Sequence, residues 1–179
     1  MALSGDDFLM AISGLITVGL NVVETATSDL SSARDAIAQA ISVVLSDGTG
    51  INACNKRWAD SRSLASGVSD NLDLSGSLTN MYGTTVAFTA VKFMFIQNTT
   101  ALSASYLDIV PGTNGWSSWA AGGGGFNLPS GYSSTSAGAF VLLANCTAAG
   151  YSVVAGTGDI LKITANDGVV TYNIILIGV

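Results

Sequence analysis

From Thr84 to the C-terminus, hydrophobic side chains recur with a period of two in short segments, and this feature constrains the fold more than any other. In the segment Val91–Gln97, for example, Phe93 and Phe95 fall on one face. A period of two is that of a β-strand, and the segments are bounded by Gly, Asn, Asp and Pro, which favour turns. The sequence therefore predicts an all-β fold of antiparallel strands.

Nine candidate segments of this kind occur, close to the roughly eight strands expected of a jelly roll or a related β-sandwich. They lie at residues 58–64, 70–74, 84–89, 91–97, 103–110, 139–144, 151–154, 160–164 and 169–177. The last has apolar side chains on both faces, which predicts a central strand. Asn166-Asp167-Gly168 tolerates positive φ, so we expect a tight turn that pairs residues 159–165 and 169–177 as an antiparallel hairpin.

The N-terminal quarter does not share this pattern, so we divide the chain into an N-terminal arm, residues 1–45, and a β-sandwich domain, residues 46–179. The segment Ser31–Leu45 fits a short helix, because Ser residues cap helices and Asp35 lies in the first turn. The same segment also fits a strand in which Ile37, Ile41 and Val43 alternate with Gln39 and Ser42. We favour the helix and keep the strand as the alternative.

The apolar run Phe8–Leu20 is predicted to be an intersubunit element of this arm. Asp6 and Asp7 precede it, unlike the cations that precede a signal peptide, and it is shorter than the roughly 20 residues that span a bilayer. An apolar stretch of this kind aggregates unless a partner covers it. The side chains expected to contact another subunit or a partner are Phe8, Leu9, Ile12, Leu15, Ile16 and Leu20.

The chain lacks the residues on which most catalysis depends. It contains no histidine, so Ser-His-Asp and Cys-His arrangements are excluded, and Cys54 and Cys146 are too far apart in sequence for a metal motif. We expect two free, buried thiols, with one disulfide as the alternative. Asp70 and Asp73 would point to opposite faces of a strand, so they do not form a catalytic pair. The sequence predicts no enzyme, no cofactor and no metal.

The charge pattern bears on partners. The net charge is −6 with six cations, which disfavours nucleic acid. Three of the cations, Lys56, Arg57 and Arg62, cluster; we expect an ion-paired or solvated strand edge, and a contact to an acidic partner is the alternative. Only 10% of the residues are charged, so a surface of small uncharged residues can be covered by a partner at little desolvation cost.

The segment Gly112–Tyr132 interrupts the strand pattern and carries four aromatic residues among its glycines. A loop of about 20 residues within a compact domain is typical of a functional segment. Exposed aromatic rings can stack on sugars or anchor a protein interface, and the alternative is that they close the open end of the sandwich. The candidate contact residues here are Trp116, Trp119, Phe126 and Tyr132.

Two separated blocks of sequence resemble small virion proteins encoded in the structural gene blocks of tailed bacteriophages. The first comprises Ala59–Ala65 (ADSRSLA) and Asp70–Thr79 (DNLDLSGSLT), and the second comprises Gly150–Leu161 and Thr171–Ile175 (TYNII). The resemblance covers roughly residues 46–179, with Asp47-Gly48-Thr49-Gly50 at its upstream boundary. It implies a β-sandwich head protein of the decoration or cement kind.

That resemblance implies a capsid decoration protein that binds and stabilises the major-capsid shell in several copies. The expected partners are the major capsid protein and further copies of the chain, most simply as a trimer, with neither nucleic acid nor a membrane as partner. The expected location is the capsid surface of the virion, after assembly in the host cytoplasm. A head fibre or carbohydrate-binding module that attaches to the host through Trp116, Trp119 and Tyr132 is the alternative.

Overall fold

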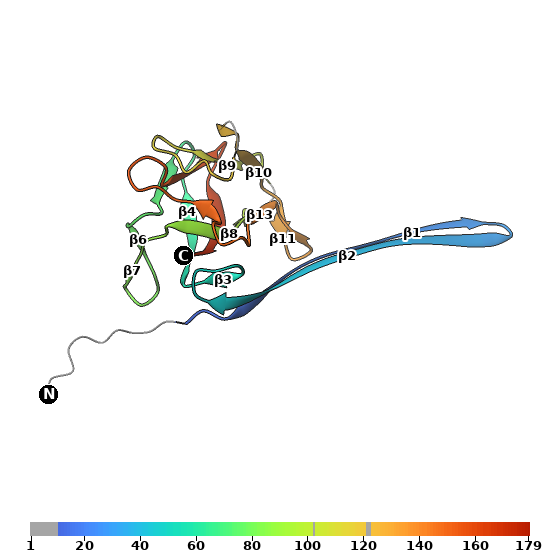
Figure 1. Ribbon diagram of the computed structural model, residues 1–179. Coiled ribbons are helices and arrows are strands. Elements are labelled where there is room, and N and C mark those ends of the chain that lie inside the picture. The colour runs from blue at the N-terminus through green and yellow to red at the C-terminus, as the bar shows by residue number, and fades with distance from the viewer. Residues whose placement is uncertain (1–10, 102, 121–122) are drawn as a thin grey trace.

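The computed structural model describes residues 11–101, 103–120 and 123–179, so the predicted contact residues Phe8 and Leu9 lie outside the described part. Every named element is a β-strand, which confirms the predicted all-β class. No helix long and apolar enough to cross a membrane occurs in these ranges. The molecule consists of a body with two main sheets and a long two-stranded arm that projects from it (Figure 1).

The body is built from antiparallel strands in two sheets, as a β-sandwich requires. One sheet has the order β13-β8-β16-β4, with β14 beside β8, and the other has the order β10-β9-β15-β5. Their main strands are β4 (Lys56–Leu64), β5 (Ser69–Asp73), β8 (Ala90–Asn98), β9 (Tyr106–Pro111), β10 (Phe126–Pro129), β13 (Phe140–Ala144), β15 (Ile160–Asn166) and β16 (Val170–Gly178). The short strands are β3 (Ala53–Cys54), β6 (Leu78–Thr79), β7 (Thr85–Val86), β11 (Tyr132–Ser133), β12 (Ser136–Ala137) and β14 (Tyr151–Ser152).

The pairing of the eight main strands shows how the chain winds. In chain order, the first strand pairs with the eighth (β4 with β16) and the second with the seventh (β5 with β15). The third pairs with the sixth (β8 with β13), and the fourth with the fifth (β9 with β10). The body is therefore one long antiparallel double strand, folded so that successive pairs lie alternately in the two sheets.

This winding contradicts the predicted hairpin between the last two strands. β15 pairs with β5 and β9, whereas β16 pairs with β4 and β8 in the other sheet. The turn itself is present, because Asp167 and Gly168 have φ of 55° and 147°. This turn connects β15 in one sheet to β16 in the other. Positive φ values at these two residues are therefore compatible with a connection between sheets as well as with a hairpin.

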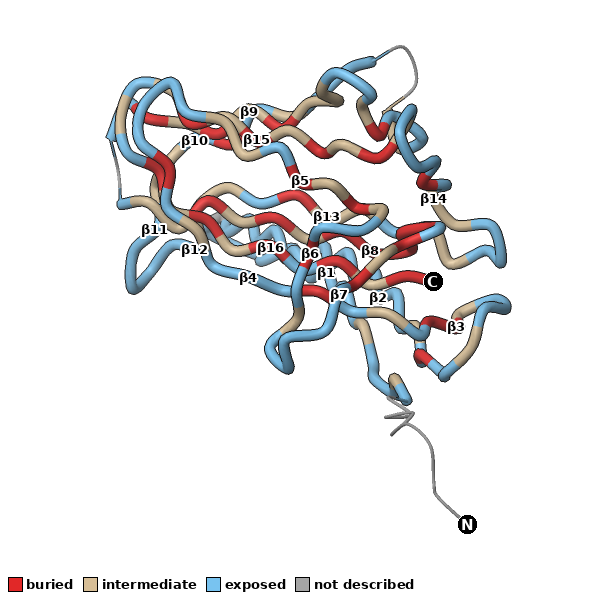
Figure 2. The backbone as a smooth tube through the Cα atoms, turned by 90° about the vertical axis from the view of Figure 1, so that its left-hand side faces the viewer, coloured by how far each residue is buried: buried red, intermediate tan, exposed pale blue. Residues whose placement is uncertain are grey.

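The core lies between the two sheets and takes one side of each strand. β15 alternates buried and half-buried residues along its length, and Leu161, Ile163 and Ala165 are its buried members. β16 contributes Ile174 and Leu176 from the opposite sheet, and it lies between β8 and β4, which confirms its predicted central position. Buried residues follow these strands through the body, whereas the loops around them are exposed (Figure 2).

The arm consists of β1 (Gly14–Ser28) and β2 (Ser31–Asp47), which pair along their whole length from Gly14 opposite Leu45 to Ser28 opposite Ser31. The helix favoured for Ser31–Leu45 is therefore wrong. The spacing of Ile37 and Ile41 fits both a helix and a strand, and the β-branched residues of β1 provide a strand partner that decides between them. At about 3.3 Å per residue, the arm is about 50 Å long.

A further correction concerns the segment Gly112–Tyr132. Phe126–Pro129 forms β10 and pairs with β9, so this part of the predicted loop belongs to a sheet. One glycine that weakened the strand pattern in the sequence, Gly125, is required by the close approach of this segment to β9. A Cβ on Gly125 would lie 2.4 Å from the carbonyl oxygen of Ile109. The glycine-rich sequence therefore brings the aromatic residues next to the body.

Candidate assembly surfaces

The aromatic residues of the segment Gly112–Tyr132 differ in exposure. Trp116 is completely buried, and its indole Nε1 donates a hydrogen bond to the carbonyl oxygen of Ser152 at 2.9 Å. Trp119 and Phe126 are half-buried against the core, whereas the ring of Tyr132 is 43% exposed. Trp116 is thus part of the core rather than a ring offered to a ligand, which agrees with the alternative that it closes the sandwich.

These rings stack on one another. Trp119 and Phe126 are nearly parallel with centroids 5.4 Å apart, and Trp116 lies 6.0 Å from Trp119 and 6.3 Å from Tyr151. Offset and edge-to-face contacts at such distances stabilise a fold beyond the apolar area that they bury. One ring face of Trp119 and one of Phe126 are therefore used within the protein, and both residues are half-buried. Tyr132 remains available, but it is separated from the other rings as part of the small β11–β12 hairpin.

The predicted contact residues of the arm are divided between its base and its free part. Ile12 and Ile16 pack against a small hydrophobic cluster of Leu45, Cys54 and Phe93 at the base. Leu15 and Leu20 are 63% and 56% exposed. The structure thus brings Ile12 and Ile16 together at the body and leaves Leu15 and Leu20 in solvent.

The arm has two chemically different faces. Residues directly opposite each other in the register share a face, and Ile16 is opposite Val43 while Val18 is opposite Ile41. The same face continues with Leu20 opposite Gln39 and Val22 opposite Ile37. We call this set the apolar face of the arm: Ile16, Val18, Leu20, Val22, Ile37, Gln39, Ile41 and Val43.

The other face of the arm consists mostly of small and polar residues. It carries pairs such as Thr17 opposite Ser42 and Asn21 opposite Ala38. Both strands therefore alternate apolar and polar residues in the way that a half-buried strand does. Yet the apolar face is uncovered beyond the base, since Leu20 and Ile41 are 56% and 66% exposed. The arm has the sequence of an element that is buried on one side, and none of the residues in 11–101, 103–120 and 123–179 covers that side beyond the base.

A buried lysine fixes the loop at the base of the arm. Lys92 is completely buried, and its Nζ donates hydrogen bonds to the carbonyl oxygens of Thr49, Gly50 and Ala53 at 3.3, 2.5 and 2.7 Å. These carbonyls belong to the loop and strand that follow β2. Hydrogen bonds from a charged donor are stronger than neutral ones, so Lys92 holds the end of β2 against β8.

The two cysteines are free thiols beside this base, as predicted. Cys54 is buried and Cys146 is half-buried, so the expectation that both are buried holds for Cys54 alone. Burial raises the pKa of the Cys54 thiol, the charge of Lys92 opposes this shift, and Cys146 adds to it. A thiol with a raised pKa is a poor nucleophile and acts here as an apolar side chain.

The sheet that contains β8 and β16 has an apolar outer face. Phe95 is opposite both Leu142 on β13 and Ile175 on β16, so the three side chains form a row across the sheet. Phe140 lies 6.0 Å from Phe95, ring centroid to ring centroid, and is 56% exposed. We call Phe95, Phe140, Leu142 and Ile175 the outer patch. It was detectable in the sequence as apolar residues on both faces of the last strand, but the sequence does not show which face is uncovered.

A groove of about 500 Å³ separates the outer patch from the base of the arm. Its walls are the arm segment from Leu15 to Gly19 and the sheet side chains Phe93, Phe95, Phe140, Leu142, Ile175 and Ile177. Apolar side chains of this density normally line the inside of a protein, and soluble monomers rarely expose them together. The groove therefore has the chemistry of an interface.

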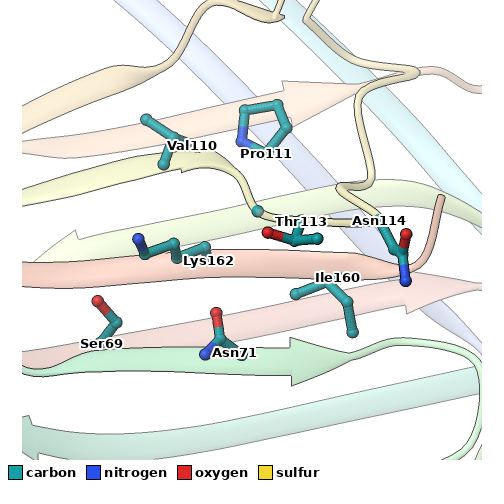
Figure 3. Close-up of a pocket in the computed structure, with 9 residues that line it drawn as sticks. Ser69, Asn71, Val110, Pro111, Thr113, Asn114, Ile160 and Lys162 are labelled. Atoms are coloured by element: carbon teal, nitrogen blue, oxygen red, sulfur yellow. The ribbon is translucent and has the colours of Figure 1, made fainter. Parts of the chain in front are cut away.

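A second groove, of about 540 Å³, lies on the opposite sheet, and its lining combines polar residues with Val110, Pro111 and Ile160 (Figure 3). Ser69 and Asn71 of β5 and Lys162 of β15 form its floor, beside Thr113 and Asn114 of the following loop. Lys162 is the one charged side chain among the nine lining residues. A single ammonium group without a neighbouring acid or base does not provide general acid–base chemistry.

The predicted cation cluster is partly used within the fold. Arg62 contacts Asp60 at 2.9 Å and Asp70 at 3.3 Å, and Tyr172 donates its hydroxyl to the same Asp70 at 2.7 Å. For Arg62 this confirms the ion-paired strand edge. Lys56 and Arg57 have no ion pair among the described residues.

Two further carboxylates, Asp159 and Asp73, have structural roles. Asp159 is buried and accepts hydrogen bonds from the Ser75 hydroxyl at 2.9 Å and the Gly156 amide at 2.5 Å. Asp73 accepts from the amide and hydroxyl of Ser75. In the described ranges, no group of three or more His, Cys, Asp or Glu side chains is arranged to hold a metal ion.

Comparison with protein-family models, with curated proteins and with solved structures found no match for this chain.

Proposed function

We propose that this chain is a structural protein of a tailed-bacteriophage virion, a decoration or cement protein that binds and stabilises the major-capsid shell in several copies. The observation that carries the proposal is the arm, which extends about 50 Å from the body and leaves its apolar face uncovered. Exposed apolar surface of this extent serves protein–protein contact. The proposal includes location on the capsid surface and no enzymatic activity.

Two further features support a role in assembly. The low content of charged residues, 10% of the chain, lets partner proteins cover the surface at little desolvation cost. The strand order also supports the finer assignment to a jelly roll, because a jelly roll is a long antiparallel double strand wound over two sheets, a fold common in viral capsid proteins. A trimer, with closed symmetry, is the simplest assembly for such a protein.

The experiment that tests this function adds purified protein to capsid shells of the encoding phage that were assembled without it. We expect saturable binding in co-sedimentation and a higher melting temperature of the decorated shells. Ser42→Asp, on the polar face of the arm, should bind like the wild type. Ile41→Asp, the adjacent residue on the apolar face, should lose most of the binding, because multivalent attachment depends on the arm. Absence of binding by the wild type at micromolar concentration would contradict the proposed function.

A further inference from the structure

Two apolar surfaces of the molecule begin at the same place and then separate. The apolar face of the arm starts at Ile16 and Val43, which pack on the small cluster at the base, and continues to Val22 and Ile37. The outer patch starts beside Phe93, a buried member of that cluster. The arm leaves the body and does not return to it (Figure 1), so the chain cannot cover either surface with the other.

The base of the arm shows within one chain how the two surfaces fit together. There Ile16 and Val43 pack in the same cluster as Phe93 and Ile177, which places aliphatic arm residues on the outer face of the sheet. Phe95 and Ile175 repeat this arrangement two residues further along each strand, where the groove separates them from the arm segment 15–19. The uncovered part of the sheet therefore continues an established packing arrangement and has the same chemistry.

The charges next to the two surfaces are complementary. Beyond Val22 and Ile37, the apolar face of the arm ends with Glu24 directly opposite Asp35, about 7 Å further along the strands. Like charges in this position destabilise a strand pair unless a cation compensates them. On the sheet, Arg57 of β4 is directly opposite Ile177 of β16, about 5 Å away on the neighbouring strand. Arg57 has no ion pair among the described residues. Both surfaces thus change from apolar to charged over a similar distance, with opposite sign.

We infer that the apolar face of the arm of one copy lies on the outer patch of a second copy, with Glu24 and Asp35 toward Arg57 of that copy. The two surfaces are then buried by each other, each copy both giving and receiving an arm. This inference deepens the proposed function, on which it rests only in assuming that copies of the chain stand side by side.

The area that would be buried favours an exchange of arms over a single contact. A two-stranded ribbon about 10 Å wide and about 25 Å long over its apolar stretch presents on the order of 250 Å² on one face. With the matching surface of the sheet, one contact buries on the order of 500 Å², below the roughly 1,200 Å² at which specific interfaces begin. Two such contacts, as in a dimer with exchanged arms, come close to that range, and three, as in a trimer, reach it in total.

The test uses two full-length variants that damage opposite sides of the contact. Ile41→Asp damages the arm and leaves the outer patch intact, whereas Phe140→Asp damages the patch and leaves the arm intact. The matched controls are Ser42→Asp, on the polar face of the arm, and Val169→Asp, which replaces an exposed aliphatic residue outside the patch. Thermal unfolding of each variant shows that its body is folded.

Sedimentation velocity of purified protein, without shells, gives the result. We expect the wild type and both controls to be oligomers, and each damaged variant alone to associate on the order of 100-fold or more weaker, because an unpaired carboxylate would be buried in an apolar contact. An equimolar mixture of Ile41→Asp and Phe140→Asp should associate more strongly than either variant alone and more weakly than the wild type, because an intact arm meets an intact patch at one of the two contacts of each mixed pair. A mixture that associates no better than either variant alone overturns the inference, as does a Phe140→Asp protein that still assembles alone, because arms would then pack on arms.

The same experiment separates this inference from the proposed function. A wild type that is monomeric at micromolar concentration but decorates shells overturns the exchange of arms and leaves the structural role in place. Complementation between the variants, together with no binding to shells, supports the exchange and contradicts the role on the capsid.

Discussion

The body and the arm use the same sequence pattern, but only the body buries it. In β15 the alternate residues Leu161 and Ile163 face a second sheet and are completely buried. In β2 the alternate residues Ile37 and Ile41 are 55% and 66% exposed. A period of two therefore shows that one side of a strand is suited to burial. It does not show whether the residues that bury this side belong to the same chain. On this account the cover of the arm is another protein molecule.

This difference predicts that comparable truncations have unequal effects on stability. Ile174→Ala, in the core of the body, should lower the free energy of unfolding by about 3 kcal/mol, because it opens a cavity among buried side chains. Ile41→Ala, in the arm, should change it by less than about 0.5 kcal/mol. Denaturant unfolding of dilute, dissociated protein measures both values. Equal losses would show that the arm belongs to the core.

The junction between the two regions should show an intermediate effect. Lys92→Met keeps the length of the side chain but leaves the carbonyls of Thr49, Gly50 and Ala53 without their donor, at a cost of about 2 kcal/mol. Hydrogen exchange should accelerate at the amides of residues 49–54 more than in β15. If exchange accelerated equally in both places, Lys92 would stabilise the body as a whole rather than the base of the arm.

Within the body, the contact between Tyr172 and Asp70 predicts an effect of pH. Burial raises the pKa of Tyr172 strongly, and the hydrogen bond to Asp70 and its charge add to the shift, while Arg62 opposes it. A raised pKa in the folded state means that the stabilisation is complete below the unfolded pKa of about 10 and is lost as the pH rises above it. Tyr172→Phe should cost about 1 kcal/mol at pH 7 and flatten the decline above pH 10. Urea unfolding between pH 7 and 11 measures it; an identical decline in both proteins would assign it to other groups.

The smallest expected effect is that of salt on association. The predicted contact is mainly apolar, and the charges of Glu24, Asp35 and Arg57 lie at its margin. Raising the salt concentration from about 0.1 M to about 1 M shortens the screening length from about 10 Å to about 3 Å, yet the dissociation constant should change by less than about tenfold. Sedimentation equilibrium measures it. Dissociation by moderate salt alone would show that ion pairs, not the apolar face, hold the copies together.

The sequence predicts most strands of the body because their pattern is local. The segments expected at residues 58–64, 91–97 and 169–177 correspond to β4, β8 and β16 within two residues at each end. The partners of the strands are not local. The turn at Asp167 and Gly168 has the residues of a hairpin, and only the order of the whole sandwich decides that it joins two sheets.

The errors in the arm and the aromatic segment have the same origin. The spacing of Ile37 and Ile41 satisfies two periods, and pairing with β1 selects the strand. Trp116 appeared exposed because it follows a loop sequence, but Ser152 and Tyr151, far along the chain, complete its surroundings. The free cysteines and the paired Arg62 were predicted because their chemistry requires no knowledge of the fold.

The most direct test of the central claim is the oligomeric mass of a protein with a shortened arm. Gly19 and Ala40 are directly opposite in the register, so residues 20–39 can be replaced by an Asn-Gly turn without disturbing the base. By sedimentation velocity we expect a monomer at concentrations where the wild type is an oligomer, with the free energy of unfolding of the body unchanged within about 0.5 kcal/mol. A shortened protein with the mass of the wild-type oligomer would contradict the account.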